Sequence, residues 1–174
     1  MTVLVAYGSK RGGTEGLAKM VGAALREEGF AADVRPARRV GDISGYQAVI
    51  VGGALYALRW HRDARRFVRR HAAELWARPT YLFSSGPLDD SARSGDIPPV
   101  KGVRAAMDRI GATGHMTFGG RLTPDAKGFP AKAMAKKNAG DWRDEGHVRE
   151  WVHTIAATLR APATRPAARR PIDT

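Results

Sequence analysis

The 174-residue sequence contains no cysteine. This absence excludes disulfide bonds, thiolate-bound metals, iron–sulfur clusters and a cysteine nucleophile. A long apolar segment is also lacking at the N-terminus, where a short apolar run ends at Gly8 without a preceding basic stretch, so we expect neither a signal peptide nor a membrane span there. We therefore expect a cytoplasmic protein, and the length fits one compact domain.

Acidic residues are scarce. Only 17 Asp and Glu oppose 29 Lys and Arg, which gives a net charge of +12. The excess falls in residues 59–78, 121–143 and 160–174 and is absent from the rest of the chain. Such a charge indicates an anionic partner: a small-molecule substrate, an acidic protein, a membrane surface or a nucleic acid.

Short apolar runs alternate with amphipathic helical patterns along the chain. Strands are expected at residues 3–7, 32–35, 48–51, 81–85 and 115–118, and helices at 14–28, 62–75, 103–110 and 144–159. This alternation predicts an α/β fold in which a parallel sheet is covered by helices on both faces. We expect one domain over residues 1–160, with a basic insert at 123–144, and a flexible tail rich in Ala, Pro and Arg at 161–174.

Open parallel sheets bind ligands beyond the carboxyl ends of their strands. The loops at residues 8–14, 52–60 and 84–97 follow three of the expected strands and form the candidate site. The first loop precedes a helix, whose N-terminal N–H groups attract anions. It lacks the lysine of an ATP-binding P-loop, because Thr14 stands at that position, and its glycines do not have the spacing of a dinucleotide fingerprint. The alternative is a plain turn with a helix cap.

The hydroxyl-rich pattern of Ser9, Gly12 and Thr14 resembles the phosphate loop of flavodoxins. This resemblance implies an FMN cofactor, bound by its phosphate, and a flavodoxin-like three-layer fold with five parallel strands in the order 2-1-3-4-5. Arg11 replaces the usual hydroxyl residue of the family, so it either adds a charge to the phosphate or points into solvent. The residues expected at the phosphate are Ser9, Lys10, Arg11, Gly12, Gly13 and Thr14.

The segment from Gly52 to Trp60 is similar to the flavodoxin-like family that includes the menaquinone-dependent protoporphyrinogen oxidases. Small residues here let backbone approach a ligand, while Tyr56 and Trp60 could cover a flat ring or simply pack in the core. The third loop is expected at the ring edge, although a surface turn would have the same composition. The residues expected around the ring are Ala54, Leu55, Tyr56, Trp60, Ser84, Ser85, Gly86, Pro87, Leu88 and Asp89.

Three functions are compatible with these patterns. The resemblance implies an FMN oxidoreductase that oxidises a protoporphyrinogen-type substrate with a quinone acceptor, in contact with the inner face of the membrane. The second is an electron-carrier flavodoxin with an unusually basic surface. The third is a non-enzymatic module that binds anions or nucleic acid through its arginine-rich helix, although no nucleic-acid-binding motif accompanies that helix. No metal-ligand spacing is present, and neither catalytic residues nor an oligomeric state are predicted.

Overall fold

The computed structural model describes residues 1–124 and 139–161. The elements are, in chain order, β1 (Thr2–Gly8), α1 (Gly13–Glu27), β2 (Ala31–Pro36), η1 (Ala37–Arg39), β3 (Ala48–Tyr56), β4 (Arg59–Trp60), α2 (Arg62–Arg70), α3 (Ala72–Trp76), β5 (Thr80–Ser85), α4 (Ser91–Ser94), α5 (Lys101–Ile110), β6 (Gly114–Phe118), β7 (Arg121–Leu122), β8 (Gly140–Asp141) and α7 (Glu145–Arg160). Residues 125–138 of the expected basic insert and residues 162–174 of the tail expected at 161–174 lie outside the described residues.

The five long strands form one parallel sheet in the order β2-β1-β3-β5-β6. These are the five strands expected from the sequence, in the order that the flavodoxin resemblance implies, so the fold prediction is confirmed. The short β4 is additional and pairs antiparallel with the end of β3. Within the described residues, no helix combines the length and apolar character needed to cross a membrane.

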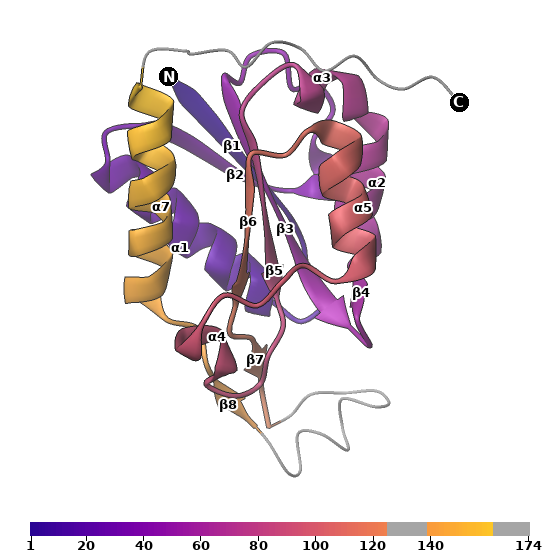
Figure 1. Ribbon diagram of the computed structural model, residues 1–174, viewed down its shortest axis with the longest axis vertical. Helices are drawn as coiled ribbons and strands as arrows, with labels where there is room; N and C mark the ends of the chain where they lie inside the picture. The colour runs from indigo at the N-terminus through magenta and orange to yellow at the C-terminus, as the bar shows by residue number, and fades with distance from the viewer. Residues whose placement is uncertain (125–138, 162–174) are drawn as a thin grey trace.

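Helices cover both faces of the sheet, with α1 and α7 on one side and α2 and α5 on the other (Figure 1). The strands supply both cores because successive side chains point to opposite faces. In β1, Val3 and Val5 pack in the core with α1 and α7, whereas Leu4 and Ala6 pack in the core with α2 and α5. The continuous apolar run of β1 follows from this burial on both sides.

Two elements differ from the sequence expectation. The helix expected over residues 62–75 is divided at His71, which is buried, lies against the Phe67 ring and places its Nδ1 2.8 Å from a carboxylate oxygen of Glu74. Strand β3 continues to Tyr56 instead of ending near residue 51. The expected loop at 52–60 is therefore the end of a strand and a tight hairpin.

Gly52 and Gly53 let this part of β3 pack closely against two aromatic rings. A Cβ atom at Gly52 would overlap the ring of Phe83, and one at Gly53 would overlap the indole of Trp60. These glycines were expected to admit a ligand, and that reason is wrong, since two core aromatic rings occupy the space. Both aromatic side chains are buried, so the glycines serve packing within the sheet.

Candidate functional site

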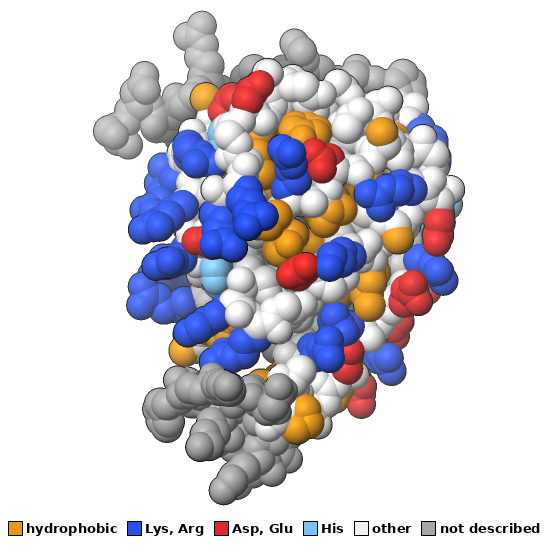
Figure 2. Space-filling view, turned by 180° about the vertical axis from the view of Figure 1, so that it is seen from behind, with side chains coloured by type: hydrophobic (Ala, Val, Ile, Leu, Met, Phe, Trp, Pro, Cys, Tyr) orange, Lys and Arg blue, Asp and Glu red, His pale blue; other side chains and the backbone are white. Residues whose placement is uncertain are grey.

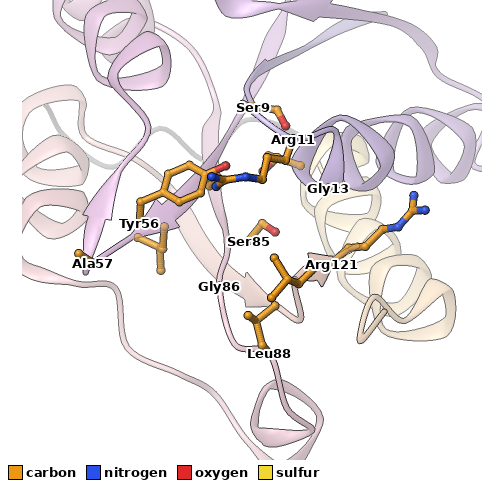
Figure 3. Close-up of a pocket in the computed structure, with 14 residues that line it drawn as sticks. Ser9, Arg11, Gly13, Tyr56, Ala57, Ser85, Gly86, Leu88 and Arg121 are labelled. Carbon is orange, nitrogen blue, oxygen red and sulfur yellow. The ribbon is translucent and has the colours of Figure 1, made fainter. Parts of the chain in front are cut away.

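A pocket opens at the carboxyl ends of β1, β3 and β5, where the sequence placed the site. We call it the strand-end pocket, and it has a volume of about 320 Å³. Small-molecule sites in proteins span roughly 300–1,000 Å³, so it is at the lower end of that range. Its lining consists of Ser9, Arg11, Gly13, Thr14, Ala54, Leu55, Tyr56, Ala57, Ser85, Gly86, Leu88, Gly120, Arg121 and Leu122 (Figure 3).

The loop between β1 and α1 forms the polar end of the strand-end pocket. Gly12 has a left-handed φ of 79°, and its N–H donates to Ser9 Oγ over 3.1 Å, which closes the loop. Helix α1 then begins at Gly13, and its first N–H groups lack partners within the helix. A positive helix end therefore faces the cavity, which suits an anion.

Thr14 is the most informative residue of this loop. The residue is 1% exposed, and its Oγ1 is buried without a hydrogen-bond partner among the residues that the structure describes. Buried hydroxyl groups are nearly always hydrogen-bonded, because leaving one unpaired costs roughly 1–3 kcal/mol. Thr14 also lines the strand-end pocket, so an acceptor or donor within the pocket would satisfy this hydroxyl.

The opposite end of the strand-end pocket is apolar. Leu55 and Tyr56 come from the end of β3, Leu88 follows β5, and Leu122 comes from β7. Gly86 N–H donates to the carbonyl of Phe118, and Gly120 N–H donates to the carbonyl of Pro87 over 2.7 Å. These bonds hold the loops after β5 and β6 together. The result is a cavity with hydroxyl and N–H groups at one end and aliphatic walls at the other.

The residues expected at the site divide into two groups. Those in the strand-end pocket are Ser9, Arg11, Gly13, Thr14, Ala54, Leu55, Tyr56, Ser85, Gly86 and Leu88. Those outside its lining are Lys10, Gly12, Trp60, Ser84, Pro87 and Asp89.

Specific contacts account for the second group. Trp60 is 2% exposed and belongs to the core beneath α2, so it packs instead of covering the pocket. Ser84 Oγ lies 3.0 Å from His115 Nε2 on β6. Asp89 is exposed and accepts a hydrogen bond from the N–H of Ser91. Lys10 lines a different hollow, described below.

Ala57, Gly120, Arg121 and Leu122 line the strand-end pocket but were not among the expected residues. Ala57 lies on the hairpin between β3 and β4. The other three lie where the chain after β6 passes close to two other segments: a Cβ atom at Gly119 would overlap the carbonyl of Trp142, and a Cβ at Gly13 would lie 3.6 Å from Arg121. The paired glycines at 119 and 120 were the only local signal for this close approach.

Arg11 lines the strand-end pocket, and its contact with a phosphate stays a prediction. Its guanidinium lies over the ring of Tyr56, 5.6 Å from the ring centroid, at the edge of the strand-end pocket (Figure 3). Arg121 extends in the opposite direction and lies 3.9 Å from Asp141. No group of three His, Asp or Glu side chains suited to a metal ion occurs in residues 1–124 and 139–161.

Comparisons with known proteins agree with this geometry. A family model described as Flavodoxin domain matches residues 4–138. No curated protein matches the chain.

Solved structures with a similar fold include two kinds of protein. Flavodoxin from Pseudomonas aeruginosa, in a single-site mutant, has a TM-score of 0.61 and 16% identity, covering 91% of this chain and 99% of its own. Rubredoxin oxygen:oxidoreductase from Desulfovibrio gigas has a TM-score of 0.64 and 15% identity, covering 92% of this chain. This chain spans only 36% of that longer protein. At 15–16% identity, these matches show that this chain shares their fold and show nothing further about it.

The strand-end pocket fits the flavodoxin cofactor FMN by its own chemistry. The unpartnered Thr14 hydroxyl and the start of α1 suit a phosphate, and the walls formed by Leu55, Leu88 and Leu122 suit a flat apolar ring. The family model covers well over half of the chain. This protein therefore belongs to the flavodoxin domain family, whose cofactor is FMN.

Proposed function

We propose that this protein is an FMN-dependent electron-transfer protein that exchanges electrons with a negatively charged partner. The observation that carries the proposal is the buried, unpartnered Thr14 hydroxyl at the polar end of an otherwise apolar strand-end pocket. When bound, FMN supplies one- and two-electron redox chemistry, whereas the protein supplies binding and orientation.

Different residues of the chain would bind the phosphate and the ring of FMN. Thr14 Oγ1 and the first N–H groups of α1 would bind the phosphate, which needs no metal there. Leu55 and Leu88 would exclude water from the ring. Tyr56 and Leu58, at the hairpin between β3 and β4, are 36% and 77% exposed, so they offer an apolar contact beside the strand-end pocket.

The charge of the partner follows from the surface. Figure 2 shows Lys and Arg side chains gathered over the side of the molecule that carries α2, which adjoins the hairpin between β3 and β4. Exposed cations of this helix include Arg62, Arg66 and Arg69. A field of this sign accelerates encounters with anions and slows encounters with cations.

The test compares electron acceptors of opposite charge. FMN-loaded protein, reduced anaerobically with dithionite and then separated from it, is mixed with ferricyanide or with a cationic cobalt complex. We expect faster oxidation by ferricyanide, with a rate that falls as salt rises. Equal rates, or a preference for the cationic acceptor, would refute an anionic partner, and a failure to bind FMN would refute the function itself.

Oxidation of a protoporphyrinogen-type substrate with a quinone acceptor is a narrower form of this proposal. Its support is the sequence resemblance over residues 52–60 together with the cationic surface. The family model and the solved structures support the flavodoxin domain and do not extend to this substrate. Anaerobic mixing with protoporphyrinogen and a menaquinone analogue tests it: turnover supports the oxidase, and reduction only by a partner reductase supports a carrier.

A further inference from the structure

A second hollow adjoins the strand-end pocket and shares Ser9, Arg11 and Tyr56 with it. We call it the cationic hollow, and its volume is about 750 Å³. The remaining lining residues are Lys10, Arg38, Arg59, Trp60, His61, Arg62 and Asp63. A molecule in the cationic hollow would therefore lie beside the flavin site, with Tyr56 and Arg11 between them.

Charge is the main property of the cationic hollow. Five cationic side chains line it against the single carboxylate of Asp63, which lies 3.5 Å from Arg62. Among the described residues, no acidic side chain forms an ion pair with Lys10, Arg38 or Arg59. Like charges held around one concavity repel each other, and a bound anion would remove that cost.

Arginines elsewhere on this side of the protein serve the fold. Arg70 donates to the carbonyl of Val40, and Arg78 donates to the carbonyl of Tyr46 over 2.8 Å. These bonds tie α2 and the segment after α3 to the chain between η1 and β3. Within residues 1–124 and 139–161, Lys10, Arg38, Arg59 and Arg62 donate to no backbone carbonyl.

The cationic side chains come from separate parts of the chain. Lys10 lies on the loop after β1, Arg38 on η1, Arg59 on β4 and Arg62 at the start of α2. His61 lies between β1 and the start of α2. Its Nδ1 accepts a hydrogen bond from Asp63 N–H over 3.2 Å, and the same atom lies 2.7 Å from the position that a Cβ atom of Gly8 would take. Close packing of β1 on the start of α2 therefore brings the cationic side chains together.

We propose that the cationic hollow binds a small organic polyanion carrying two or more carboxylate or phosphate groups, as the substrate or electron partner of the adjoining flavin. The proposal rests on the proposed function and specifies its partner class. Concavity favours a small molecule over an acidic protein surface, since the volume falls within the range of ligand pockets, roughly 300–1,000 Å³. Several cations at different points of the wall favour several anionic groups on one ligand.

The experiment is calorimetric titration of the full chain, saturated with FMN, with citrate, inorganic diphosphate or acetate. We expect citrate or diphosphate to bind with one-to-one stoichiometry, and acetate to bind far more weakly. Whichever of the two binds more tightly identifies the carboxylate or the phosphate source. Arg59→Gln and Arg38→Gln should each weaken binding by roughly tenfold, because each removes a charge-assisted contact.

Arg66→Gln is the matched control, since it removes an equal charge from an exposed position of α2 outside the cationic hollow. It should change citrate or diphosphate affinity by less than about twofold. Equal losses in all three variants, or displacement of the polyanion by FMN, would overturn the proposal. So would binding of a glutamate-rich peptide without binding of citrate or diphosphate, because that result assigns the charge to protein docking.

The two proposals fail in different ways. If the unaltered protein binds the polyanion but does not bind FMN, the result supports the cationic hollow as an anion site and refutes the flavin function. Normal FMN binding without any polyanion binding would refute the cationic hollow and leave the flavin function standing.

Discussion

The guanidinium of Arg11 lies over the ring of Tyr56, 5.6 Å from its centroid, and both residues line the strand-end pocket and the cationic hollow. The two side chains therefore form part of the wall that the two cavities share. A cation over an aromatic ring contributes about 0.5–1 kcal/mol at an exposed site. Arg11 therefore lines the flavin site itself and also contacts Tyr56, which lines it as well.

Replacing Arg11 tests that relationship. We expect Arg11→Gln to weaken FMN binding by about two- to fivefold, the equivalent of the lost contact, in a fluorescence titration of the flavin-free protein. Lys10→Gln removes the same charge from the neighbouring position, which does not line the strand-end pocket, and should have a smaller effect. A loss beyond about thirtyfold would mean that Arg11 reaches the phosphate directly.

Thr14→Val separates cofactor binding from stability. It should weaken FMN binding by about 1–3 kcal/mol, because the hydroxyl loses its contact with the phosphate. The same change removes an unpaired buried hydroxyl, so the flavin-free protein should become equally or more stable in urea unfolding. Thr117→Val is the control, since Thr117 Oγ1 donates to the carbonyl of Ile97: it should lower stability and leave FMN affinity unchanged. Unchanged FMN affinity in Thr14→Val, or a loss of stability in its flavin-free form as large as that in Thr117→Val, would contradict this role.

The hairpin between β3 and β4 offers a pair of matched variants. Ala57 and Leu58 have positive φ angles of 47° and 60°, a conformation that glycine adopts at lower cost. Ala57→Gly and Leu58→Gly should each raise the free energy of unfolding by about 0.5–1 kcal/mol. Only Leu58→Gly removes a large exposed apolar side chain, so only this variant should slow electron exchange with a partner that has an apolar surface. Equal rates for both variants would exclude Leu58 from the contact.

His115 makes stability depend on pH. Burial, with a smaller contribution from Arg104, lowers the pKa of His115 from 6.5 to about 4 in the folded protein. The unfolded chain therefore binds a proton that the folded chain resists, and the free energy of unfolding falls as pH drops from 6.5 toward 4. Above pH 6.5 the imidazole is neutral in both the folded and the unfolded chain, so His115 causes no loss of stability there.

Urea unfolding at several pH values checks the effect of His115. His115→Gln cannot titrate but keeps a group within reach of Ser84, so its stability should fall less than that of the wild type over this range. His153→Gln, at an exposed position paired with Glu28, controls for the loss of a histidine. Parallel curves for the wild type and His115→Gln would show that His115 does not titrate in this range.

The strands and the helix faces could be predicted because they depend on local periodicity, whereas the strand order was implied by the resemblance to flavodoxins. The run around Val5 identifies a strand buried on both faces, and helices must cover both of those faces. The hydroxyls of Ser9 and Thr14 could be located for the same reason, since the strand, loop and helix are consecutive in sequence.

The errors concern contacts between distant segments. For Trp60 the sequence left ring cover and core packing open, and its indole packs in the space over Gly53. Arg121 reaches the strand-end pocket because its strand passes over the start of α1, near Gly13. No local pattern reports which distant side chain will fill a given space, so packing of this kind required the structure.

FMN binding is the central claim, and its most direct measurement is the titration of flavin-free protein with FMN and with riboflavin, which lacks the phosphate. We predict one FMN per chain, with quenched flavin fluorescence, and much weaker binding of riboflavin, because Thr14 and the start of α1 have no phosphate to hold. Equal affinity for the two flavins, or no binding of FMN, would contradict the assignment of the strand-end pocket.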